Sequence, residues 1–76
     1  MYTLEMAKAI RSIPCPKNFH VDIFDHEDFL TVRADEYEFV KLPHDEKLAA
    51  VEYMIRVKDA LEQNGAMVLL ERNPVK

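Results

Sequence analysis

The chain has 76 residues, enough for one small domain, which we expect to span residues 1–76. Hydrophobic residues make up 49% and charged residues 32% of it, a balance that excludes a largely disordered chain. The net charge of −4 disfavours direct nucleic-acid binding, and the sequence has no apolar run of about 18 residues that could cross a membrane. A single cysteine rules out an internal disulfide, and we expect a cytoplasmic protein.

The first element that we expect is a short helix beginning at Thr3, whose hydroxyl is suited to capping a helix. Apolar residues follow at helical spacing: Met6, Ala9, Ile10 and Ile13. Pro14 ends this helix, and Pro14-Cys15-Pro16 predicts an extended connector, because residues before proline avoid the α region.

Three strands are expected next. Residues 19–24 and 29–34 alternate in hydrophobicity, with the polar turn Asp25-His26-Glu27-Asp28 between them. A turn at Asp35-Glu36 leads to a third predicted strand, residues 37–42, whose register stays open because apolar side chains fall on both of its faces.

The most regular segment is 42–65, which predicts a long helix capped by Asp45 and ended by Asn64-Gly65. One stripe of this helix is apolar and is expected to pack on a sheet: Ala50, Val51, Met54, Val57 and Leu61, widened by Leu48 and Ile55. The run 66–70 is apolar on both faces, which is typical of a strand that is central or covered on both sides. Asn73-Pro74 should end that strand.

These elements predict an α+β fold in the order α-β-β-β-α-β, a two-layer sandwich of helices on a mostly antiparallel four-stranded sheet. The last strand should run parallel to the third through a right-handed crossover, and one possible strand order is 3-2-1-4. The sheet face away from the helices would then be too apolar for water, so that the first helix or something else should cover it. Its expected residues are His20, Asp22, Phe24, Phe29, Thr31, Arg33 and one pair from Met67/Leu69 or Val68/Leu70.

The order of the first five elements resembles that of the double-stranded-RNA-binding domain. That family has a lysine-rich start to its second helix, whereas this chain has Pro43-His44-Asp45-Glu46 at the equivalent place. Acidic residues there would repel phosphates, so the resemblance concerns the layout and does not imply RNA binding.

The sequence bears on three kinds of chemical site: a metal site, a nucleophilic cysteine and a phosphate-binding loop. His20, His26 and His44 lie among aspartates and could bind a metal, but the sequence lacks the spacings of known zinc or calcium motifs. Cys15 is expected to be a small packed side chain rather than a nucleophile. Gly65 is the only glycine, so no glycine-rich phosphate loop exists, and we expect no metal, no cofactor and no enzymatic activity.

The first functional hypothesis is therefore a non-enzymatic protein-interaction or regulatory module that self-associates. It rests on the surplus apolar surface of the sheet and on a flank of the long helix. The residues expected to meet the partner are Phe24, Phe29, Arg33 and Tyr53.

The alternative is an acidic inhibitor that mimics nucleic acid, of the type that mobile elements encode. Its basis is the concentration of acidic residues in the middle of the chain, which could imitate a row of phosphates for a basic protein. The residues of this acidic surface are Asp22, Asp25, Glu27, Asp28, Asp35, Glu36 and Glu38.

Overall fold

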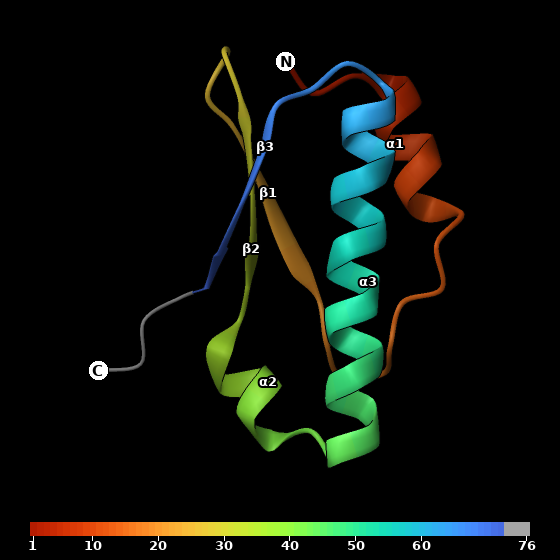
Figure 1. The fold of residues 1–76 in the computed structure, drawn as a ribbon, viewed down its shortest axis with the longest axis vertical. Helices are drawn as coiled ribbons and strands as arrows, with labels where there is room; N and C mark the ends of the chain where they lie inside the picture. Colours follow the sequence, from red (N-terminus) through yellow and green to blue (C-terminus); the bar gives the residue numbers. More distant parts are fainter. Residues whose placement is uncertain (73–76) are drawn as a thin grey trace.

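A computed structural model describes residues 1–72, within which there are three helices and three strands (Figure 1). Their order is α1 (Leu4–Arg11), β1 (Val21–Asp25), β2 (Leu30–Ala34), α2 (Glu36–Lys41), α3 (His44–Gln63) and β3 (Val68–Arg72). The strands form one mixed sheet in which β2 is central, antiparallel to β1 and parallel to β3. Helices α1 and α3 lie together on one side of it. The predicted four-stranded, mostly antiparallel sheet and the order α-β-β-β-α-β are therefore wrong.

The expected third strand, residues 37–42, is instead the short helix α2. The Asp35 side chain caps it by accepting hydrogen bonds from the backbone N–H groups of Tyr37 (2.9 Å) and Glu38 (3.2 Å). Acidic residues in the first turn and Lys41 in the last turn suit the helix dipole. The sequence predicts a turn at Asp35-Glu36, but an aspartate at this position is equally suited to begin a helix, and the absence of two-residue alternation in 37–42 favours the helix.

Because residues 37–42 form a helix and not a strand, the last strand of the sheet also lies elsewhere than predicted. β3 lies beside β2, with Leu30 opposite Val68 and Val32 opposite Leu70, so the order is β1-β2-β3 rather than 3-2-1-4. The run that the sequence marked as central or doubly covered thus has a neighbouring strand on only one side within residues 1–72. The predicted stop at Asn73-Pro74 lies outside the described residues.

The helix ends show which capping predictions were correct. Thr3 caps α1 as expected, since its Oγ1 accepts from the Met6 N–H at 3.2 Å. Asp45 is not the cap of α3, because the cap lies two residues earlier, at Pro43, which makes no side-chain hydrogen bond. Gly65 ends α3 as expected and adopts a φ of +90°, which a residue without Cβ accepts without strain.

The buried side of α3 is rotated from the predicted stripe. Its buried residues are Ala50, Tyr53, Met54, Val57 and Leu61. Tyr53 faces inward because α1 packs beside α3 and because the Tyr53 ring meets Phe19 edge-on, with centroids 6.4 Å apart. Leu48, Val51 and Ile55, predicted to widen the packed stripe or belong to it, are exposed.

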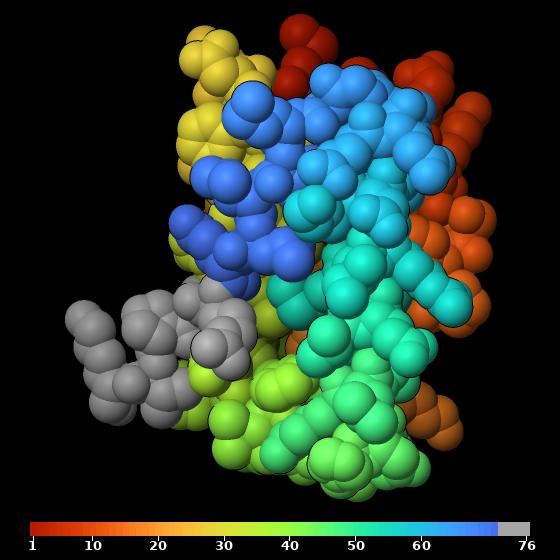
Figure 2. Space-filling view, viewed as in Figure 1, coloured from red at the N-terminus to blue at the C-terminus, as the bar shows by residue number. Residues whose placement is uncertain are grey.

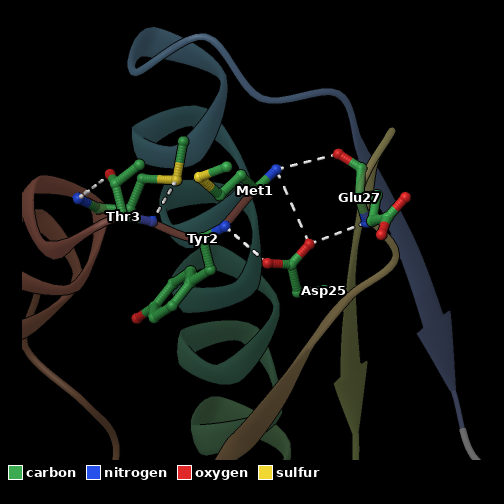
Figure 3. A network of polar contacts seen from close by, with 6 residues as sticks. Met1, Tyr2, Thr3, Asp25 and Glu27 are labelled. Carbon is green, nitrogen blue, oxygen red and sulfur yellow. Dashed lines mark hydrogen bonds and ion pairs between the residues drawn. The ribbon is translucent and has the colours of Figure 1, made fainter.

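The N-terminal segment is tied to the β1–β2 turn by polar contacts (Figure 3). The two oxygens of Asp25 accept from the backbone N–H groups of Tyr2 and Glu27, each at 2.9 Å. The Met1 amino group donates to Glu27 O at 3.1 Å. These backbone hydrogen bonds, from Tyr2 and then Glu27, lower the pKa of Asp25 below its usual value.

The element order of the structure differs from that of the double-stranded-RNA-binding domain, because helix α2 follows the hairpin where that family has a third strand. None of the helices in residues 1–72 combines the length and apolarity that a bilayer span requires.

Candidate interaction surface

Half of the exposed large apolar side chains in residues 1–71 gather on one surface. Of twelve such side chains, six come from the outer flank of α3 and from β3 with the residue before it. Figure 2 shows α3 and β3 side by side on this face of the molecule. We call it the α3–β3 surface, and its residues are Leu48, Val51, Ile55, Met67, Leu69 and Leu70. Leu70 lies on the helix side of the β3 edge, whereas Leu69, opposite Thr31, lies on the side away from the helices.

A groove runs between the two elements of this surface. It has a volume of about 280 Å³, and its lining is Val51, Met54, Ile55, Leu70 and Glu71. Four of these five side chains are apolar, and Leu70 is 42% exposed although it points to the helix side of the sheet. The groove is open because β3 has no neighbouring strand there within residues 1–72 to carry the sheet further under α3.

The α3–β3 surface also includes the outer edge of β3, which pairs with no further strand in residues 1–72. Leu30 donates its backbone N–H to Met67 O at 2.8 Å, so the Met67 carbonyl points toward β2. Backbone groups alternate along a strand, so the N–H and C=O groups of Val68 and Leu70 point away from the sheet. This face therefore combines apolar side chains with backbone donors and acceptors that can extend the sheet.

The sheet face away from the helices carries Asp22, Phe24, Thr31, Arg33 and Leu69, as the sequence predicted, together with Glu71. The Arg33 guanidinium lies 4.6 Å from the centre of the Phe24 ring and donates to Glu71 Oε2 at 2.9 Å. Asp22 pairs with Arg33 across the hairpin, so a charged row crosses all three strands. Thr31 is only 2% exposed, so the side chains of this face cover its centre without a further layer.

Two other residues predicted to meet a partner lie elsewhere. Phe29 stacks on His26 in the β1–β2 turn, with centroids 4.5 Å apart. Tyr53 is 8% exposed and belongs to the core, so we do not include it in a contact surface. Burial, and next the proximity of Cys15, raises the pKa of Tyr53 to about 12. Of the four predicted residues, only Phe24 and Arg33 lie together.

The predicted acidic surface divides between the two ends of the hairpin. Asp25, Glu27 and Asp28 lie at the β1–β2 turn, whereas Asp35, Glu36 and Glu38 lie at the far end of β2 and in α2. A five-residue strand separates these ends by about 16 Å. Asp25 and Asp35 also have local structural roles as acceptors of backbone hydrogen bonds.

The histidines and the cysteine do not form a reactive constellation. His20 Nδ1 lies 3.0 Å from Glu38 Oε1, and His26 stacks on Phe29. Within residues 1–72, no three His, Cys, Asp or Glu side chains are close enough to hold a metal ion. Cys15 is exposed, its thiol donates to Phe19 O at 3.2 Å, and it borders a hollow of about 250 Å³ beside Tyr53.

Sequence reasoning did not identify the α3–β3 surface, because Leu48, Val51 and Ile55 were placed in the packed stripe of the helix. One signal for it was available. The run 66–70 is apolar on both faces, and a strand of that kind is unusual at a sheet edge. Comparison of the chain with protein-family models, curated proteins and solved structures finds no match.

Proposed function

We propose that the protein is a small, non-enzymatic interaction module that works by self-association. The observation that supports this proposal best is the α3–β3 surface, where apolar side chains from two elements surround a strand edge that has no partner strand in the described part of the chain. Contiguous apolar surface rimmed by polar residues is typical of a protein–protein interface.

The sheet face away from the helices is a weaker candidate for the self-association interface. Stacking two such faces would bury the row of Asp22, Arg33 and Glu71, and the desolvation of charged groups opposes such burial. The α3–β3 surface has Glu71 at its margin and aliphatic side chains at its centre. Mimicry of nucleic acid is not proposed, because the acidic residues lie at two separate ends of the hairpin.

Light scattering coupled to size-exclusion chromatography, over a range of protein concentrations, tests this function. We expect the parent protein to form dimers and Ile55→Glu to weaken association at least about tenfold, because one uncompensated buried charge costs more than 1.4 kcal/mol. The matched control is Leu4→Glu, since Leu4 is also exposed but lies on α1.

Circular dichroism of both variants should match that of the parent, because neither side chain is buried. A parent protein that remains monomeric at millimolar concentration would refute self-association. Equal weakening by Ile55→Glu and Leu4→Glu would refute the assignment to the α3–β3 surface.

A further inference from the structure

We propose that two copies of the chain pair through β3, antiparallel and around a two-fold axis beside Leu70, to form one continuous six-stranded sheet. This inference rests on the proposed self-association and specifies its geometry. Such an interface is isologous, so each contact occurs twice. It makes β3 a central strand and brings Leu70, on the helix side of the sheet, between the two copies.

The backbone of β3 is suited to this pairing. The outward-pointing groups belong to Val68, Leu70 and Arg72, at alternate positions of the strand. With the axis at Leu70, this residue exchanges two hydrogen bonds with its own copy, and Val68 does so with Arg72 of the second copy. None of the first three residues of β3, Val68 to Leu70, has a charged side chain.

The position of α3 fits the same axis. Neighbouring strands lie about 4.8 Å apart, so β3 would lie about 2.4 Å and β2 about 7 Å from the axis. α3 contacts both of these strands, which places it about 5 Å from the axis on the same face of the sheet. The two α3 helices would then be about 10 Å apart, at the upper end of the 8–10 Å range of packed helices.

The side chains are complementary in this arrangement. Leu70 lies beside Val51 and Ile55, so the axis brings Val51 of one copy opposite Ile55 of the other. The two helices run antiparallel in this arrangement. Their contact is apolar at its centre, and the antiparallel helix dipoles add no repulsion.

The surface is large enough for a stable dimer. The face seen in Figure 2 spans 33 × 28 Å between Cα extremes. A stable interface usually buries about 800 Å² from each partner, which a face of this size can supply.

Cysteine cross-linking in a Cys15→Ser background tests the geometry, with a short bis-maleimide reagent and denaturing electrophoresis as the readout. A residue reacts efficiently with its own copy only if it lies near the two-fold axis. Leu70→Cys should cross-link, because hydrogen-bonded antiparallel pairs have Cα atoms about 5.5 Å apart. The matched control is Leu48→Cys on the same surface, which would lie roughly 15 Å from its own copy along the helix pair.

A third variant, Phe24→Cys, reports on the sheet face away from the helices. Preferential cross-linking of Leu70→Cys supports the β3 pairing. A light-scattering dimer in which Phe24→Cys or Leu48→Cys reacts instead would overturn this geometry while the proposed self-association stands. A parent protein that scatters as a monomer would overturn both.

Discussion

The two outer strands of the sheet, β1 and β3, have opposite characters. β1 carries Asp22 and Asp25, and its end is held by the N-terminal segment through Asp25. β3 begins with three aliphatic residues and is preceded by the exposed Met67. Charges on an edge strand discourage pairing with other chains, whereas an aliphatic edge invites it. The difference shows that a small sheet can carry charge on one edge strand and aliphatic residues on the other.

We expect the largest effect on the free energy of unfolding from Leu30, which lies beside both outer strands. Leu30 is fully buried in β2, opposite Asp25 of β1 and Val68 of β3. Leu30→Ala should reduce the free energy of unfolding by about 2–5 kcal/mol, from lost burial and the cavity that remains. Urea denaturation followed by circular dichroism measures this change, and a loss below about 1 kcal/mol would contradict a core shared by both strands.

A smaller effect on stability is expected from Asp25 in β1, and it depends on pH. The pKa of Asp25 is lowered by backbone hydrogen bonds from Tyr2 and Glu27, so the folded state favours the ionised carboxylate. Its stabilisation is fully present above the unfolded pKa of about 3.9 and is lost as pH falls through the lower folded pKa.

Asp25→Asn should therefore lower the thermal midpoint at pH 7 and flatten its decline in acid below about pH 4. Asp28→Asn is the control at the same turn, because Asp28 is an exposed aspartate there. Parallel pH profiles of Asp25→Asn and the parent would contradict the role of these hydrogen bonds.

We expect the smallest effect on stability from Glu71 in β3. Arg33 and Glu71 form a partly exposed ion pair of 2.9 Å that links β2 to β3 on the face away from the helices. Exposed pairs contribute about 0–1 kcal/mol, so Glu71→Gln should cost no more than that and should leave the oligomeric state unchanged. Dissociation of the dimer by this variant would show that Glu71, which borders the groove, contributes to the interface.

Prediction from the sequence succeeded where local signals agreed. The Thr3 cap, the first helix, the β1–β2 hairpin and the Gly65 end of α3 follow from neighbouring residues. The segment 37–42 failed because six residues with apolar side chains on both sides fit a strand or a helix, and the Asp35 cap decided between them. The prediction of a fourth strand then gave the sheet the wrong width and order.

The candidate surface was less predictable, for a related reason. Periodicity identifies an apolar side of α3 but not which part a sheet of given width will cover. Three strands with α1 alongside bury Tyr53 and leave Leu48, Val51 and Ile55 exposed. The neighbours of α3 decide this, and they are set by tertiary packing that local patterns do not encode.

Amide hydrogen exchange in the assembled protein tests the difference between the two outer strands most directly. The N–H groups of Ile23 in β1 and Leu70 in β3 both point away from the sheet of a single chain. NMR-detected exchange at high protein concentration should show slow exchange at Leu70 and fast exchange at Ile23, with Leu70 losing its protection on dilution or in Ile55→Glu. Equally fast exchange at both amides, at a concentration where light scattering shows dimers, would contradict assembly through β3.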